Sequence, residues 1–149
     1  MQVTLPYRNL EHTLKSLKIQ VVDSLPFLPS YIPSYIQTPQ ELFSFLKSKV
    51  NYTSDPKNTE LLQMVPTLME RGGRGDCDCF TILTLAACHY LNFKPTYVAL
   101  VGRSVKTPSH IYSEVYDPIK KKICAMDLTN PVYCMERNYN YKQRLNFVL

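Results

Sequence analysis

The feature that most constrains this chain is the junction at residues 75–80, Gly-Asp-Cys-Asp-Cys-Phe, which opens a strongly apolar run. Asp76 stands in the position of a helix N-cap, so Cys77 should lie in the first turn of a helix. Free backbone N–H groups and the positive end of the helix dipole stabilise a thiolate there, which predicts a lowered pKa for Cys77. His110 and Asp127 follow in that order. A cysteine, a histidine and an aspartate are the groups that thiol hydrolases and acyltransferases use.

The length and composition are those of one folded domain. With 149 residues, of which 45% are hydrophobic and 19% charged, the chain can bury a normal core. No run approaches the roughly 18 apolar residues that span a bilayer, so we expect no membrane insertion. The N-terminus lacks the basic and then apolar layout of a secretory signal, which favours a cytoplasmic protein.

Charge and cysteine content exclude further classes. The net charge of +5 is moderate and scattered, and no groove-reading motif is present, which argues against a nucleic-acid partner. The five cysteines are an odd number without repeated spacing, which predicts reduced thiols and not a disulfide framework. The cysteines and the histidine within 77–89 lack the paired gaps of zinc sites. We therefore expect no metal and no cofactor, and keep a metal site as a weaker alternative.

Helical patterns fill the first half of the chain. Residues 9–24 repeat leucine and valine on one helical stripe, and Thr-Pro-Gln-Glu at 38–41 is a capping box with proline at the first helical position. Between them, the prolines of 25–37 predict an extended apolar segment. The remaining expectations are a turn at 51–56, a short helix at 58–64, and a helical turn at 66–71 closed by Gly72 and Gly73.

The second half of the chain predicts an antiparallel sheet. The expected strands are 95–101, 110–116, 122–128 and one within the tail at 138–149. Helices first and such a sheet afterwards make an α+β fold. The helix from Phe80 to Leu91 is apolar on nearly every face, so it should be central and buried against the sheet.

Geometry narrows the candidate residues. His89 lies on the same predicted helix as Cys77, roughly 18 Å along its axis, so it cannot be the partner base. His12 has no motif around it, whereas His110 begins a strand directly after a loop, where a catalytic side chain is accessible. Cys79 points about 200° around the helix from Cys77, and we interpret it as structural.

The third group follows from the predicted hairpin. If strands 110–116 and 122–128 pair about a turn centred between residues 118 and 119, residues whose numbers sum to 237 face each other. His110 then faces Asp127, with Cβ atoms roughly 4.5–5.5 Å apart. Asp117 would lie on the other face, roughly 23 Å away. The hairpin thus selects Asp127, and a slip of one residue would undo the selection.

Three blocks of the sequence resemble the transglutaminase-like superfamily, within the papain-like cysteine hydrolases. Residues 72–81, Gly-Gly-Arg-Gly-Asp-Cys-Asp-Cys-Phe-Thr, are similar to its glycine-rich turn and Gly-Asp-Cys-Asp-Asp motif, with Cys79 in place of the last aspartate. Residues 110–116, His-Ile-Tyr-Ser-Glu-Val-Tyr, are similar to its histidine-led strand. Residues 126–129, Met-Asp-Leu-Thr, are similar to its apolar-Asp-Pro-Thr block without the proline.

The resemblance implies a papain-like core and a catalytic triad. Cys77 would be the nucleophile, His110 the base and Asp127 the orienting group. The backbone N–H of Cys77 would form part of the oxyanion hole. Relatives take the second donor from an upstream tryptophan, tyrosine or glutamine. Because this chain has no tryptophan, Gln63 and Tyr52 are the candidates, and Gln63 is preferred.

We therefore expect one transglutaminase-like domain over 1–149. It comprises a helical, Pro- and Tyr-rich extension at 1–44, the family core at 45–130 and a C-terminal strand region at 131–149. The expected activity is cysteine-dependent acyl transfer on an amide of a peptide or protein substrate, with hydrolysis favoured. The first alternative is an inactive or structural module in a phage particle, which would place the protein in the virion. The second is a cross-linking transglutaminase.

Overall fold

The structure is a computed structural model that describes residues 10–54, 63–104 and 108–149. Helices and strands follow one another in an order that agrees with the predicted α+β class. In chain order they are α1 (Leu10–Ser24), the 3-10 helix η1 (Leu25–Ser30), α2 (Pro39–Lys47), β1 (Asn51–Tyr52), α3 (Val65–Glu70), β2 (Arg74–Gly75), α4 (Cys77–Tyr90), β3 (Thr96–Gly102), β4 (Pro108–Asp117), β5 (Lys122–Met126) and β6 (Tyr141–Phe147).

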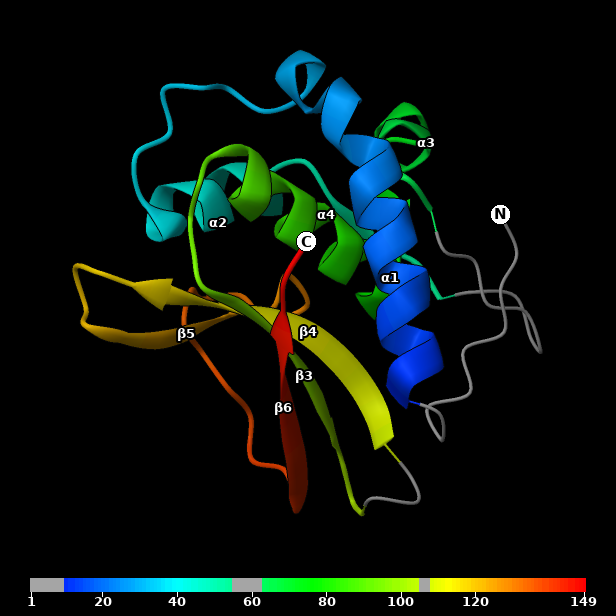
Figure 1. Ribbon diagram of the computed structural model, residues 1–149, viewed down its shortest axis with the longest axis vertical. Coiled ribbons are helices and arrows are strands. Elements are labelled where there is room, and N and C mark those ends of the chain that lie inside the picture. Colours follow the sequence, from blue (N-terminus) through cyan, green and yellow to red (C-terminus); the bar gives the residue numbers. More distant parts are fainter. Residues whose placement is uncertain (1–9, 55–62, 105–107) are drawn as a thin grey trace.

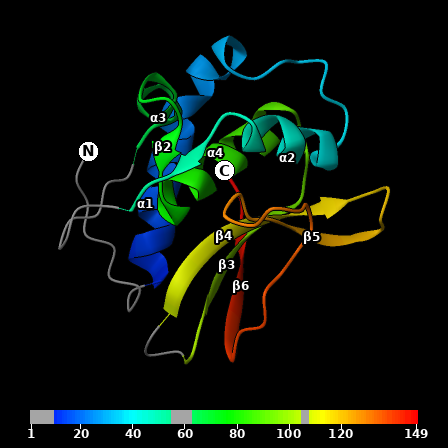
Figure 2. The same cartoon turned by 180° about the vertical axis from the view of Figure 1, so that it is seen from behind.

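The molecule has a helical layer on one face of a four-stranded antiparallel sheet. The strand order is β5-β4-β3-β6, so the strand of the C-terminal tail pairs with β3 as an edge strand. Figures 1 and 2 show the helices gathered on one side of this sheet, with α4 between the sheet and the other helices. No helix among the described residues is long and apolar enough to cross a bilayer.

Helix α4 is the centre of the core, as predicted. Asp76 caps its first turn, since its Oδ1 accepts hydrogen bonds from the backbone N–H groups of Asp78 at 3.1 Å and Cys79 at 3.4 Å. All residues from 78 to 88 are buried. A helix buried on every side gains its stability from packing, about 1.5–3 kcal/mol for each large apolar side chain removed from water.

The capping box at 38–41 is confirmed. Thr38 is the N-cap of α2, and its Oγ1 accepts a hydrogen bond from the backbone N–H of Glu41 at 3.1 Å. The Thr38 hydroxyl in turn donates to Glu41 Oε1 at 3.2 Å. The segment before it differs from the prediction, because part of 25–37 forms η1 and not an extended segment. A short 3-10 helix needs few backbone donors, so it accepts the prolines that a longer α-helix excludes.

Two short strands replace part of the predicted turn at 51–56. Asn51 and Tyr52 pair in parallel with Arg74 and Gly75, directly before α4. The parallel pairing joins segments that are 23 residues apart, so no local turn pattern could indicate it. The helix predicted at 58–64 falls largely outside the described residues.

The helical turn predicted at 66–71 is present as α3, and two glycines close it. Gly72 and Gly73 have φ angles of 72° and 74°, in the left-handed region that glycine adopts without steric cost. At Gly73 a Cβ atom would also collide with the backbone carbonyl oxygen of Lys49. This position therefore tolerates no side chain, and the chain can turn back there into β2.

The prediction of five reduced thiols is wrong for two of them. Cys124 on β5 and Cys134 form a disulfide with Cα atoms 4.5 Å apart, while Cys77, Cys79 and Cys88 are free. The segment after β5 folds back along it, and the N–H of Cys134 donates to the carbonyl oxygen of Ala125 at 3.1 Å. The sequence spacing carries no sign of this return, because it depends on the path of the chain after the strand.

Candidate active site

The β4–β5 hairpin brings His110 and Asp127 together, although its predicted register is wrong. Ser113 pairs with Met126 and Asp117 with Lys122, so facing residues sum to 239 and not 237. Because the shift is even, the two residues stay on one face of the sheet. Asp127 lies just beyond the last pair, and its Oδ2 is 2.7 Å from Nε2 of His110.

The carboxylate of Asp127 is held at both oxygens. Oδ1 accepts hydrogen bonds from the backbone N–H of Thr129 at 3.0 Å and from its hydroxyl at 2.7 Å. Oδ2 accepts from Asn130 Nδ2 at 3.4 Å in addition to His110. Burial by itself would raise the pKa of Asp127, but the hydrogen bond and charge of His110 and the bonds from Thr129 outweigh it and lower the pKa. Asp127 is therefore an ionised, oriented partner for the imidazole.

Asn130 connects this carboxylate to the segment that follows the disulfide. Its Nδ2 also donates to the backbone carbonyl oxygen of Met135 at 3.0 Å, and the residue is buried. Neither Asn130 nor Thr129 was predicted to bond to Asp127. The adjacency of both residues to Asp127 was the available signal, since short polar side chains commonly bond to backbone and carboxyl groups a few residues away.

Cys77 is the first residue of α4 and lies against β4. Its thiol faces the backbone of Ile111, the residue after His110, and this backbone lowers the pKa of the thiol. Thr81, one turn along α4, donates from its hydroxyl to the carbonyl oxygen of Cys77 at 2.7 Å and also lies 3.4 Å from that of Ile111. The start of α4 is thus tied to the strand position next to His110.

The expectation of a lowered pKa for Cys77 is wrong in this structure. Burial raises the pKa of the thiol well above its ordinary value, and the charges of Asp78, Asp76 and Asp127 raise it further. The Ile111 backbone acts in the opposite direction without reversing the shift. Three carboxylates around one helix N-terminus oppose the helix dipole, so the resting residue is a thiol.

Gln63 is buried beside Cys79, and its side chain is fully engaged. Its Nε2 lies 3.2 Å from the carbonyl oxygen of Arg74 and 3.3 Å from Cys79 Sγ, and Arg71 donates to its Oε1 at 2.8 Å. The amide nitrogen therefore has one acceptor in β2 and one in the first turn of α4. This arrangement braces Cys79, which is fully buried with its pKa raised to about 11 by burial first of all.

Tyr52 is the other candidate oxyanion donor, and it lies on the outside of the molecule. Its register in the β1–β2 pair places it opposite Gly75, two residues before Cys77. Its ring meets that of Phe80 edge-on, with centroids 6.3 Å apart, so it leans on the first turn of α4. The side chain is 60% exposed and lines the same pocket as His110.

A pocket of about 350 Å³ opens at His110. The described residues that line it come from four segments and are Tyr52, His110, Thr129, Arg137 and Tyr139. The Tyr139 ring is stacked at 29° to the imidazole of His110, with centroids 6.4 Å apart. Arg137 and Tyr139 were not predicted, because they come from a segment without motif or periodic pattern, brought here by the return of the chain after β5.

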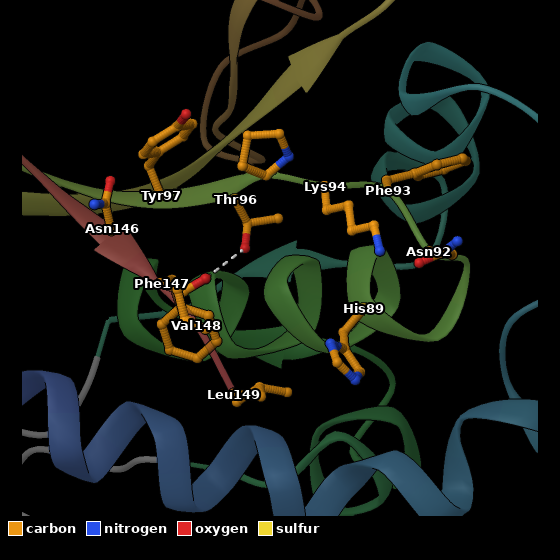
Figure 3. A pocket seen from close by; sticks show the side chains of 11 residues that line it. His89, Asn92, Phe93, Lys94, Thr96, Tyr97, Asn146, Phe147, Val148 and Leu149 are labelled. Atoms are coloured by element: carbon orange, nitrogen blue, oxygen red, sulfur yellow. Dashed lines mark hydrogen bonds between the residues drawn. The ribbon is translucent and has the colours of Figure 1, made fainter.

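A larger pocket, of about 490 Å³, lies at the opposite end of α4 (Figure 3). His89 borders it near the C-terminal end of the helix, together with Lys94 and with Phe147 of β6. The Thr96 hydroxyl donates to the carbonyl oxygen of Phe147 at 3.2 Å along one wall. None of the predicted site residues lines this pocket, so the chemistry and the larger volume lie at different ends of the helix. The part of the chain that the structure describes contains no group of three metal-ligating side chains.

The comparisons with known proteins concern the fold. No family model matches the sequence, and no curated protein matches it. One solved structure, a candidate protease from Parabacteroides distasonis, is similar with a TM-score of 0.57 at 11% identity over 91% of this chain. A candidate cysteine protease from Cytophaga hutchinsonii is similar over 85% of this chain at 18% identity, with a TM-score of 0.47. This chain spans 29% and 42% of those two chains, respectively.

These observations define a class: a mixed α/β domain with helices on an antiparallel sheet, sharing its fold with part of a larger bacterial protein.

Proposed function

We propose that this domain is a cysteine-dependent amide hydrolase of papain-like, transglutaminase-like fold, with Cys77 as nucleophile, His110 as general base and Asp127 as the group that orients the base. The observation that carries the proposal is the 2.7 Å contact between His110 Nε2 and Asp127 Oδ2. It assigns the Nε2 hydrogen to the aspartate and leaves Nδ1 with a lone pair for a proton from the thiol. The contacts of Thr81 with the carbonyl oxygens of Cys77 and Ile111, which join the start of α4 to the strand of His110, support the same constellation.

The first half of the reaction forms an acyl-enzyme. As Cys77 Sγ attacks the amide carbonyl carbon, His110 Nδ1 takes the thiol proton, and the negative charge moves to the carbonyl oxygen. The backbone N–H of Cys77 and the hydroxyl of Tyr52 would donate to that oxyanion. The C–N bond then breaks, and the imidazolium of His110 gives its proton to the leaving amine. The ionised Asp127 stabilises the imidazolium between the two transfers.

The second half releases the acid. His110 takes a proton from water as the water oxygen attacks the thioester carbon, and the proton returns to Cys77 Sγ as the C–S bond breaks. A primary amine in place of water would give cross-linking by the same steps. We favour water because the open pocket at His110 admits it readily.

The raised pKa of Cys77 favours the alternative of an inactive module, which deserves a direct test. A resting thiol can still be catalytic when its base removes the proton during attack. The hydrolase therefore predicts that acylation of Cys77 depends on His110, and the inactive module predicts that it does not.

The test is acetylation by p-nitrophenyl acetate, followed by peptide mapping of Cys77, Cys79 and Cys88. We expect acetylation of Cys77 to be faster than that of glutathione, because a general base assists the attack. His110→Gln should lower the rate to that of glutathione or below, Cys77→Ala should abolish the acyl-enzyme, and Cys79→Ala should retain it. Acetylation of Cys77 no faster than that of glutathione, and indifferent to His110→Gln, would reject the hydrolase and leave the binding module.

A further inference from the structure

Among the residues that the structure describes, the pocket at His110 contains one full positive charge that no carboxylate neutralises. Arg137 is exposed and lines the pocket, and no described residue forms an ion pair with it. None of the described lining residues is a carboxylate. The nearby Asp127 is 4% exposed and already accepts hydrogen bonds from His110, Thr129 and Asn130, so it is not available to the guanidinium.

The other charges on this face of the sheet are balanced among themselves. The buried Glu114 accepts from Arg144 Nε at 2.7 Å and from Lys142 Nζ at 2.9 Å. Lys142 also contacts Glu136 at 2.5 Å. Two carboxylates therefore meet two cations, and the network includes no contact with Arg137. The surplus charge is the one that borders the candidate catalytic base.

The position of Arg137 makes it accessible to a substrate. Tyr139, two residues along, stacks on His110, and both side chains line the same pocket as Tyr52. In the proposed reaction the substrate amide lies beside the imidazole of His110, and that imidazole lines this pocket. A guanidinium binds a carboxylate through two parallel hydrogen bonds between opposite charges. An amide is neutral and has one acceptor oxygen, so it cannot replace the carboxylate.

We propose that Arg137 is a specificity-determining residue that binds a carboxylate of the substrate, so that the preferred substrates are acidic peptides. The inference rests on the proposed hydrolase function. The carboxylate belongs either to an aspartate or glutamate side chain or to a free peptide C-terminus. Both sources present the same group to Arg137, and matched probes separate them.

The experiment measures the alkylation rate of Cys77 with two probe pairs. Bromoacetyl-glycine and bromoacetyl-glycinamide differ in a terminal carboxylate; the bromoacetyl derivatives of aspartic acid α-amide and asparagine amide differ in a side-chain carboxylate. For each pair we compare the rate of the acid with the rate of the amide. In at least one pair we expect this acid-to-amide ratio to be about tenfold higher in the wild type than in Arg137→Gln. Arg137→Glu should invert the preference, and added salt should reduce it.

Lys122→Gln is the matched control. Lys122 is exposed, and its strand position faces that of Asp117 at the far end of the hairpin from His110. The substitution removes one positive charge and should leave the ratio unchanged. If both ratios are the same in the wild type and in Arg137→Gln while Cys77 still reacts in a His110-dependent manner, the carboxylate inference is overturned and the hydrolase proposal stands. If His110→Gln leaves the rates of both probes unchanged, the hydrolase proposal fails as well.

Discussion

His110 Nε2 and Asp127 Oδ2 lie 2.7 Å apart, although β4 and β5 stop pairing at Ser113 and Met126. The chain after β5 positions the carboxylate, through the hydrogen bonds of Thr129 and Asn130, and the ladder only brings it to the correct face. A hydrogen bond that determines the tautomer of the imidazole is thus built from the strand end and the turn together.

Asp127→Asn should lower the acylation rate of Cys77 by about 10²–10⁴-fold, since an amide can hold the imidazole in the wrong tautomer and cannot stabilise its cation. The rate is measured with p-nitrophenyl acetate at a pH above which the wild-type rate no longer increases. Thr129→Val removes only the hydroxyl bond to Asp127 Oδ1 and should cost about tenfold or less. Equal rates in the wild type and in Asp127→Asn would contradict the orienting role.

Two reactions at the Cys77 thiol distinguish whether Tyr52 or Gln63 is the second oxyanion donor. Tyr52→Phe should slow acylation by about 10²-fold, because the oxyanion loses a donor, and leave alkylation by iodoacetamide unchanged, since alkylation forms no oxyanion. Gln63→Leu should instead lower the melting temperature, because Arg71 and the Arg74 carbonyl lose their partner. A selective loss of acylation in Gln63→Leu would restore Gln63 as the donor.

The disulfide between Cys124 and Cys134 should stabilise the fold by about 2–3 kcal/mol, since it closes a short loop in the unfolded chain. Urea unfolding with and without a reductant measures this difference. Cys124→Ser with Cys134→Ser should reproduce the reduced value and no longer respond to reductant. Unchanged stability on reduction would show that the closure contributes little.

Acid should destabilise the protein through Asp127 and Asp117. Burial would raise the pKa of Asp117, but its bonds from Tyr133, Lys120 and Ile119 lower it, as those of His110 and Thr129 lower that of Asp127. A folded pKa below the unfolded value, about 3.9, stabilises the fold fully above it and less as pH falls through the folded pKa. Thermal unfolding between about pH 5 and 2 should therefore show a decline that is shallower in Asp117→Asn and Asp127→Asn.

Glu114 is a buried carboxylate whose loss removes the ion-pair partner of Arg144 and leaves Lys142 with Glu136 alone among the described residues. Glu114→Gln should destabilise the fold by about 1–3 kcal/mol in urea unfolding, less than for a fully buried pair because Arg144 and Lys142 are partly exposed. The double variant Glu114→Gln with Arg144→Gln should lose less stability than the sum of the losses in the two single variants. Additive costs would mean that the two side chains do not interact.

Local patterns predicted those parts of the molecule that neighbouring residues determine. Thr38 and Glu41 form the predicted cap, Gly72 and Gly73 close a helical turn, and Asp76 begins the buried helix at Cys77. These features need only a few residues in sequence, since capping bonds and left-handed turns are made within one turn of chain. The face shared by His110 and Asp127 was also predictable, because side chains alternate along a strand.

Only the tertiary structure decided the features that depend on distant segments. The two-residue shift of the hairpin, the Cys124–Cys134 disulfide and the pairing of Tyr52 with Gly75 each require a chain path that no local motif encodes. Burial, the largest cause of the raised pKa of Cys77, has the same origin. The helix dipole that favours a thiolate and the charges of Asp78 and Asp76 that oppose it are local, whereas burial and the field of Asp127 arise from packing against the sheet.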